Sequence, residues 1–245
     1  RNPVAEAVRA GVPVARVFVS GSIGDDRVEE VVRAAAAQGA PILEVTRRDL
    51  DVATDGAVHQ GVAIEVPAYE YTDLEDLLAS AQQQVDVPLL VALDQVTDPH
   101  NLGAVLRSSG AFNADGVLIP ERRSAGVTTT AWKVSAGAAA HVPVARVTNL
   151  VRALQECRKA GYFVVGLDGG SDVSVRDLPL ATEPLVLVTG AEGAGLSRLV
   201  RETCDQVVSI PISGRVESLN AAVATGIALY EVASLRSALL DAATD

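Results

Sequence analysis

The chain has 245 residues, of which 49% are hydrophobic, and its 31 acidic and 20 basic side chains give a formal net charge of −11. It contains no apolar run of about 18 residues and no basic-then-apolar start, so we expect neither a membrane span nor a secretory signal, and we expect a cytoplasmic location. The negative charge argues against a nucleic-acid partner, because phosphate contacts depend on Lys and Arg, so any such binding has to come from local groups of arginine.

Helical and strand-like patterns alternate over residues 1–67 and predict a small α/β domain. Asn2 followed by Pro3 is typical of an N-cap and a first helical position, and apolar residues recur after them at helical spacing. Because the chain starts at Arg1 and contains no methionine, we expect that a natural N-terminal stretch precedes it. The predicted elements are a first helix, a strand at 14–19, a helix at 26–38, and strands at 42–45 and 61–66.

A second domain is predicted at residues 87–245, after a linker at 68–86. The linker holds five acidic side chains and no basic one, and its pattern predicts one acidic amphipathic helix. Beyond it, near-continuous apolar strands alternate with helices, which is typical of a parallel sheet covered on both faces. Ligands of such sheets bind beyond the carboxyl ends of the strands. The predicted strands are 88–94, 116–120, 163–168, 185–190 and 207–211, and the predicted helices are 102–111, 149–160 and 219–240.

Three segments of the second domain combine a strand, a polar or glycine-rich loop and the start of a helix. The first, at 93–120, has Asn101 at the end of its loop and Arg107 within the helix. The second, at 185–205, has a glycine-rich turn that would let backbone approach a ligand closely. The third, at 207–231, leads into the closing helix, where free N–H groups and the positive end of the helix dipole gather.

Each segment also has a simpler interpretation when it is taken singly. Asn101 and Ser218 are residue types that commonly cap helices, and Arg107 would then be an ordinary solvent-facing side chain. The spacing of Gly190 and Gly193 does not follow the GxGxxG pattern, and the turn lies late in the chain, which argues against a dinucleotide site. No single segment therefore establishes a function.

The three segments together resemble a known family. In order they read DPHNLGAVLRSS, VTGAEGAGLS and IPISGRVESLNAAVATGIALYE, and this series is similar to the three motifs of the SpoU/TrmH branch of the SPOUT superfamily of RNA 2′-O-ribose methyltransferases. The resemblance covers Pro88 to about Val232. The N-terminal sequences NPVAEAVRA and HQGVAIEV also resemble the accessory domain of bacterial enzymes in this branch that methylate 23S ribosomal RNA.

The resemblance implies a fold and a reaction that the hydrophobic pattern cannot reveal. It implies an α/β catalytic domain with a deep trefoil knot, against the ordinary rule that chains do not thread through loops. It further implies S-adenosylmethionine as cofactor, a homodimer formed through the catalytic domain, and an N-terminal RNA-binding domain that selects large-subunit ribosomal RNA. The expected product is a methylated ribose 2′-hydroxyl, by analogy on a guanosine.

The same resemblance assigns roles to individual positions. Arg107 matches the residue usually given the proton-accepting role, although a guanidinium with so high a pKa is a poor base and a phosphate clamp is the easier role. Our hypothesis is that Asn101 and Glu192 hold Arg107 and the local loops, and that Ser218 and Asn220 fix the cofactor loop and the substrate ribose. The positions expected to bind the cofactor are Thr189, Gly190, Gly193, Ile210 and Leu219.

Other expectations concern RNA contacts and metals. Arg122 and Arg123 are candidates for phosphate contacts, and His59 is a candidate either for an RNA contact or for stabilising a turn. Cys157 and Cys204 show neither CxxC spacing nor a nearby histidine pair, so we expect reduced packing residues and no metal site.

Several alternative functions remain open from the sequence. The same chemistry could act on transfer RNA, or on a ribosomal nucleotide whose methylation gives antibiotic resistance. The acidic balance also allows a binding-only RNA chaperone or ribosome assembly factor. The parallel-sheet pattern and glycine turn alone would allow a nicotinamide-dependent oxidoreductase.

Overall fold

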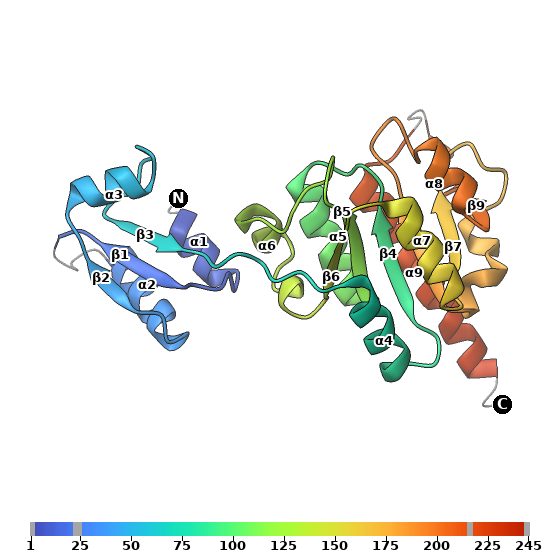
Figure 1. Ribbon diagram of the computed structural model, residues 1–245, viewed down its shortest axis with the longest axis horizontal. Helices are drawn as coiled ribbons and strands as arrows, with labels where there is room; N and C mark the ends of the chain where they lie inside the picture. Colours follow the sequence, from blue (N-terminus) through green and yellow to red (C-terminus); the bar gives the residue numbers. More distant parts are fainter. Residues whose placement is uncertain (1–2, 22–25, 215–217, 243–245) are drawn as a thin grey trace. The chain divides into compact units, whose positions relative to one another are not determined.

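The chain divides into two units, Arg1–Tyr69 and Glu70–Asp245, which are described separately (Figure 1). The structure is a computed structural model that describes residues 3–21, 26–214 and 218–242. No helix within these ranges is long and apolar enough to cross a membrane.

The first unit is a three-stranded sheet with helices packed on it. Its strand order is β2-β1-β3, with β1 parallel to β2 and antiparallel to β3. The alternating exposure of β1 arises because Val17 and Val19 point into the core that helices α1 and α2 cover. The elements are α1 (Pro3–Arg9), β1 (Arg16–Val19), α2 (Asp26–Ala37), β2 (Ile42–Glu44), α3 (Arg47–Ala53) and β3 (Val62–Glu65). All the elements predicted for this domain are present, and α3 is an addition.

The second unit contains a six-stranded, wholly parallel sheet, which confirms the predicted class. Its order is β6-β5-β4-β8-β7-β9. The central strands β4 and β8 are buried at every residue, as expected where helices cover both faces. The strands are β4 (Leu89–Leu93), β5 (Gly116–Pro120), β6 (Val144–Val147), β7 (Phe163–Leu167), β8 (Leu185–Thr189) and β9 (Gln206–Val208). Strand β6 was not predicted, because its four residues lie beside an alanine-rich stretch with no clear period.

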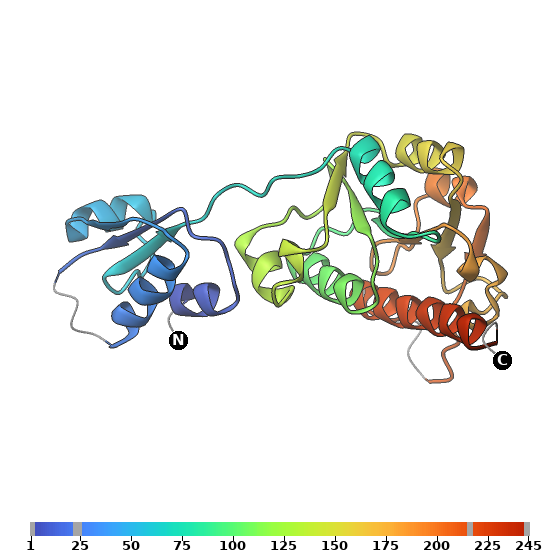
Figure 2. The same cartoon turned by 90° about the horizontal axis from the view of Figure 1, so that it is seen from below.

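Helices cover the two faces of this sheet (Figure 2). On one face α4 and α7 pack over a core that includes Leu77, Leu154 and Tyr162. On the other face lie α5 and α9, which contact each other, and α6, which packs on α5. The helices are α4 (Leu74–Gln84), α5 (Pro99–Ala111), α6 (Thr129–Val134), α7 (Leu150–Lys159), α8 (Arg198–Thr203) and α9 (Ala221–Ala242).

The stretch predicted as a linker belongs largely to the second unit. Helix α4 buries Leu77 and Leu78 against the sheet, and Thr72 pairs with Ala145 of β6. Gly116 of β5 leaves room for this helix, because a Cβ there would lie 2.5 Å from Leu77 Cδ1 and the leucine side chain would have to move. The predicted acidic helix is therefore fixed to the second unit from residue 72 onward.

The position of strand β8 in the sheet brings three loops together. Although it comes late in the chain, it lies between β4 and β7, so the loops after β4, β7 and β8 meet at one edge. The strand order alone does not establish the trefoil knot, which stays a prediction.

The closing helix is held at its far end by Arg236. This guanidinium donates to the carbonyl oxygens of Ala181 and Val87, both at 2.7 Å, and of Glu183 at 3.0 Å. Burial lowers its pKa from the ordinary arginine value. One side chain thereby joins α9 to the segments that precede β4 and β8.

The two cysteines are not reactive thiols. Cys157 is fully buried between α7 and the sheet, and burial raises its pKa to about 12. Burial likewise raises the pKa of Cys204 to about 12. Both are free cysteines, in keeping with the packing role expected of them. Among the residues that the structure describes, no cluster of three or more His, Cys, Asp or Glu side chains could hold a metal ion.

Candidate active site

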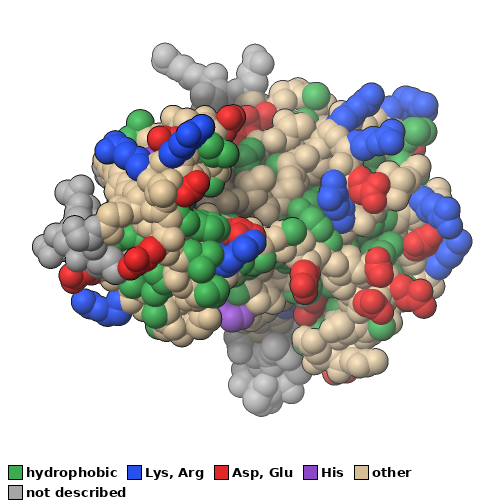
Figure 3. All heavy atoms as spheres, turned by 60° about the vertical axis from the view of Figure 1, so that its left-hand side comes forward, with side chains coloured by type: hydrophobic (Ala, Val, Ile, Leu, Met, Phe, Trp, Pro, Cys, Tyr) green, Lys and Arg blue, Asp and Glu red, His purple; other side chains and the backbone are tan. Residues whose placement is uncertain are grey.

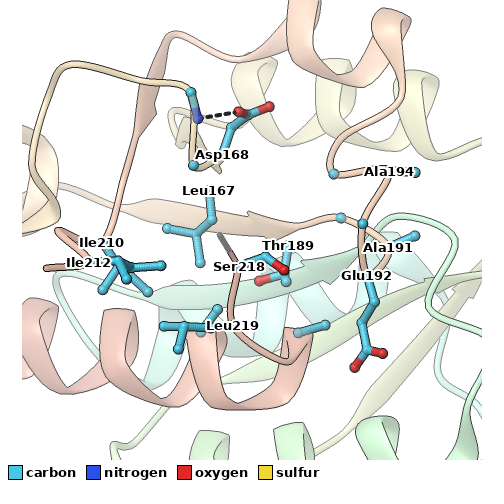
Figure 4. Close-up of a pocket in the computed structure, with 17 residues that line it drawn as sticks. Leu167, Asp168, Thr189, Ala191, Glu192, Ala194, Ile210, Ile212, Ser218 and Leu219 are labelled. Atoms are coloured by element: carbon cyan, nitrogen blue, oxygen red, sulfur yellow. Dashed lines mark hydrogen bonds between the residues drawn. The ribbon is translucent and has the colours of Figure 1, made fainter. Parts of the chain in front are cut away.

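A cavity of about 320 Å³ lies beyond the carboxyl ends of β7 and β8 and against the start of α9 (Figure 4). This size is within the range of small-molecule sites. Its apolar wall is formed by Leu167, Ile210 and Leu219, whereas Glu192 lies on the other side in the close-up. The structure brings all five residues expected to bind the cofactor to this one cavity: Thr189, Gly190, Gly193, Ile210 and Leu219.

The glycine-rich loop is a tightly closed turn. Ala191 and Gly195 exchange backbone hydrogen bonds of 3.1 and 2.9 Å. Gly193 and Gly195 have φ values of 73° and 65°, in the region that favours glycine. A Cβ on Gly190 would lie 2.1 Å from the Gly195 carbonyl oxygen and 2.5 Å from the Leu196 nitrogen. The loop thus folds back on itself and leaves its backbone groups along the cavity wall.

Three polar motif residues form one hydrogen-bonded group beside the cavity. The Asn220 amide donates to Asn101 Oδ1 at 2.9 Å and to Glu192 Oε1. Asn101 Nδ2 donates to the same Glu192 oxygen at 3.1 Å. The Asn220 Oδ1 accepts from the backbone N–H groups of Ala222 and Val223, at 3.0 and 3.1 Å, and so caps α9. The group therefore joins the first turn of α5 and the loop after β8 to the start of α9.

The helix caps differ from the simpler interpretations of the sequence. The N-cap of α5 is Asp98, whose carboxylate accepts from the His100 N–H at 2.8 Å, so Asn101 is not the cap. The cap of α9 is Asn220, and Ser218 lines the cavity instead. Ser218 therefore faces the cavity, and the Asn101 side chain is left to bond Glu192 and Asn220 beside it.

Arg107 lies on α5 apart from this group. Its side chain is exposed, and no hydrogen bond or ion pair joins the guanidinium to any residue that the structure describes. Six positions along a helix turn its side chain roughly 120° away from that of Asn101. Neither Asn101 nor Glu192 forms a hydrogen bond with Arg107. If these two residues position Arg107, as we hypothesised, they must do so through helix α5 and the neighbouring loops.

The candidate RNA contacts are in two different settings. Arg122 and Arg123 are exposed in the loop after β5, and Arg123 has a φ of 56°. His59 accepts the Gly61 N–H at 3.0 Å through Nδ1 and contacts Asp51 through Nε2 at 3.0 Å, with 5% of its side chain exposed. This geometry accounts for His59 as a turn-stabilising residue, and an RNA contact stays a prediction.

Sequence reasoning missed the cavity residues at the end of β7 and directly after it, among them Leu167 and Asp168. Leu167 and Asp168 both line the cavity, and Asp168 accepts the Gly170 N–H at 2.9 Å and pairs with Arg201. The signal was present, because an apolar strand ending in LDGG lies at the same edge as the other loops. A further residue, Thr225, bonds Thr189 at 2.8 Å and fixes α9 to β8.

Comparison with known proteins identifies the family. Residues 88–230 match the SpoU rRNA Methylase family, and residues 1–72 match the family of RNA 2′-O ribose methyltransferase substrate-binding domains. The chain belongs to the SpoU methyltransferase family. It is 55% identical over 239 residues to a protein of Mycobacterium ulcerans and to one of Mycobacterium marinum, both named "Uncharacterized tRNA/rRNA methyltransferase". Each alignment covers 96% of this chain and 76% of the relative.

Solved structures of this SpoU group agree with the assignment. The SpoU methyltransferase AviRb from Streptomyces viridochromogenes, in complex with AdoMet, matches with a TM-score of 0.68 and 28% identity, over 96% of this chain and 88% of that one. An AdoMet-bound rRNA methyltransferase from Sinorhizobium meliloti matches with a TM-score of 0.66 and 28% identity, over 96% and 85%.

These matches confirm the predicted family, enzyme class and cofactor. The chain is an RNA 2′-O-methyltransferase, and S-adenosylmethionine is the cofactor of its family. The cavity suits that molecule, because an apolar wall can take a flat purine while backbone groups and Glu192 provide polar partners. The oxidoreductase alternative is excluded by the same matches.

Proposed function

We propose that this SpoU enzyme methylates the 2′-hydroxyl of a guanosine ribose in 23S ribosomal RNA. The observation that carries the proposal is the group of Asn101, Glu192 and Asn220, which joins three motif segments next to the cavity. The presence of an N-terminal substrate-binding domain supports a ribosomal target. We expect the enzyme to act in the cytoplasm with its RNA.

The share of this chain that each solved structure matches favours ribosomal RNA over transfer RNA as the substrate. The A. aeolicus TrmH/SpoU tRNA modifying enzyme matches only 67% of this chain, with 30% identity and a TM-score of 0.57. The rRNA methyltransferase of Sinorhizobium meliloti matches 96%. The mycobacterial relatives are named for both RNA classes, so transfer RNA is the second candidate. Two other functions remain to be tested, which are methylation of a ribosomal nucleotide that confers antibiotic resistance and RNA binding without catalysis.

The cavity residues bind and orient the cofactor. We place the cofactor against the backbone of Thr189, Gly190 and Gly193 and the side chains of Ile210 and Leu219. When bound, S-adenosylmethionine supplies an electrophilic methyl group on a sulfonium sulfur. Because the loops are closed by their own hydrogen bonds, these residues hold the pocket shape before the RNA arrives.

The polar residues have the task of orienting the ribose. Asn101, Glu192 and Asn220 fix one another, so their remaining lone pairs and N–H groups face a defined direction. Ser218 lines the cavity from the α9 side and contributes a hydroxyl to the same task. Arg107 has no internal partner among the described residues, so its guanidinium is available to clamp a phosphate of the target nucleotide.

A homodimer is part of this proposal. The face shared by α5 and α9 carries an open groove of about 660 Å³. It exposes apolar surface, since Val223 is 50% exposed and Tyr230 is 57% exposed with its ring against Phe112. An apolar patch of this kind is typical of a protein interface.

The test is transfer of labelled methyl from S-adenosylmethionine to ribosomal RNA that lacks its modifications, followed by mapping of the labelled nucleotide. A single labelled ribose in 23S RNA supports the proposal, whereas labelling confined to transfer RNA overturns the substrate. Arg107→Ala should abolish transfer and leave S-adenosylhomocysteine affinity nearly unchanged. The matched control is Arg152→Ala on α7, an exposed arginine paired with Glu156, which should keep full activity. Normal turnover by Arg107→Ala would overturn the role given to this residue.

A further inference from the structure

The loop at 121–127 is held at both ends by two side chains that have no assigned role. Tyr71 Oη accepts the Val127 N–H at 2.9 Å. The guanidinium of Arg146, on β6, lies over the Tyr71 ring at 5.2 Å from its centroid. Its Nη2 reaches the Glu121 carbonyl oxygen in a long hydrogen bond of 3.5 Å. Tyr71 and Arg146 therefore form a brace across the loop.

The loop has a conformation that requires such support. Arg123 has a φ of 56°, which costs energy for a residue other than glycine and persists only where the surroundings hold it. Ala125 donates to the Val96 carbonyl oxygen at 2.8 Å, which ties the loop to the segment before α5. The approach of Tyr71 is close, because a Cβ on Gly126 would lie 3.0 Å from its Oη.

Two neighbouring arginines of this loop lack an acidic partner among the described residues. The other exposed arginines of α7, α8 and the segment after β7 pair with carboxylates, whereas Arg122 and Arg123 have no acidic partner among the described residues. On the face drawn in Figure 3, basic side chains stand in small groups among acidic ones. RNA affinity in this acidic protein must therefore come from a few well-placed arginines. The arginines paired with carboxylates are Arg152, Arg158, Arg176, Arg198 and Arg201.

We propose that Tyr71 and Arg146 are positioning residues that fix the 121–127 loop so that Arg122 and Arg123 bind two phosphates of the RNA backbone. The inference rests on the proposed function, since it takes RNA as the substrate. The N–H groups of Arg146 that do not bond the Glu121 carbonyl oxygen remain available for a third phosphate contact. The brace acts on RNA binding and not on the cofactor cavity, which other loops form.

The test uses the whole chain with an unmodified 23S ribosomal RNA transcript. Tyr71→Phe removes the acceptor of the Val127 N–H but keeps the ring under Arg146. Loss of one such hydrogen bond should raise the KM for RNA by about fivefold, with kcat and the Kd for S-adenosylhomocysteine unchanged. The matched control is Tyr162→Phe, because the buried Tyr162 hydroxyl has no hydrogen-bond partner among the described residues. This control should leave the KM for RNA at its wild-type value.

Salt dependence separates positioning from a general loss of stability. Arg122→Ala and Arg123→Ala should each lower the slope of log affinity against log salt by about 0.7 to 0.9. Tyr71→Phe should lower this slope as well. In a chain that already lacks both arginines, Tyr71→Phe should cause no further change in the slope or in RNA affinity. A wild-type KM and slope in Tyr71→Phe, or a loss that persists without the arginines, overturns the inference.

The two proposals fail in distinguishable ways. A wild-type chain that binds the transcript through Arg122 and Arg123 but transfers no methyl group overturns the proposed reaction, and the salt slope of Tyr71→Phe still decides the role of the brace. A wild-type chain that does not bind RNA overturns both.

Discussion

Replacing Asn220 with alanine removes two kinds of hydrogen bond at once. Its Oδ1 caps α9 by accepting from Ala222 and Val223, and its amide nitrogen donates to Asn101 and Glu192. Serine at this position keeps a capping oxygen and loses the amide donor. Aspartate keeps the capping oxygen and adds a negative charge beside Glu192. The three variants therefore separate the cap from the contacts with the other motif residues.

The magnitudes follow from these contacts. Loss of the cap costs about 1 kcal/mol, and loss of the bond to the buried Asn101 costs about 1 kcal/mol. The bond to Glu192 is worth about 0.5 kcal/mol, because that carboxylate is exposed and water replaces the donor. Asn220→Ala should thus lower the free energy of unfolding by about 2.5 kcal/mol, and Asn220→Ser by about 1.5 kcal/mol.

Thermal denaturation measures this difference directly. For a domain of this size the Tm of Asn220→Ala should fall by about 5 to 10 °C and that of Asn220→Ser by about 3 to 6 °C. Methyl transfer should be strongly reduced in all three variants, because the orientation of Asn101 and Glu192 is lost. Asn220→Asp should be the least active, since two carboxylates then face each other. Equal Tm values for the alanine and serine variants would refute the capping argument, and full activity of Asn220→Asp would refute the role of the amide group.

Three further predictions concern other parts of the chain. Gly190→Ala should abolish S-adenosylhomocysteine binding in a titration calorimetry experiment, because its Cβ would lie 2.1 Å from the Gly195 carbonyl oxygen, and retained binding would show that the loop can open at little cost. Arg236→Met should lower the Tm, by roughly 4 to 10 °C, because several carbonyl oxygens lose their donor, and an unchanged Tm would contradict the role of this side chain in holding α9. The hydrogen bond from the Thr46 hydroxyl lowers the pKa of Asp49 below its usual 3.8, so the stabilisation is present above that pH and is lost as the pH falls through the lowered value. The difference in stability between wild type and Asp49→Asn should accordingly be full at neutral pH and shrink in acid, and a difference that grows in acid would contradict the assignment.

Much of the fold could be predicted from local pattern. Buried strands such as β4 and β8 are continuous apolar runs, and such runs are removed from water wherever they lie in the chain. The presence of these strands, and the parallel class of their sheet, could therefore be predicted from sequence. Strand β6 was not predicted, because it has only four residues beside an alanine-rich stretch and is too short to show a clear hydrophobic period. The antiparallel pairing of β3 with β1 was equally hidden, since pairing direction depends on the connection and not on the strand's own composition.

The candidate site shows the same division. The family resemblance assigned Thr189, Gly190 and Leu219 to the cofactor, and the structure places them on one cavity because strand ends of a parallel sheet meet at one edge. Asp168 was missed, although its strand ends at that edge too.

The sequence by itself determined which residue types are present, the helices and strands that hydrophobic periodicity requires, and the family to which the motifs belong. Only the tertiary structure decided which of these residues touch. Asn101 and Glu192 are 91 positions apart, and Asn220 is a further 28 positions along, yet they share one hydrogen-bonded group because β8 lies between β4 and β7. The brace of Tyr71 and Arg146 likewise depends on a contact between residues far apart in the chain. Local pattern is set by neighbours within a few residues, whereas such contacts are set by strand order and packing, which no local period encodes.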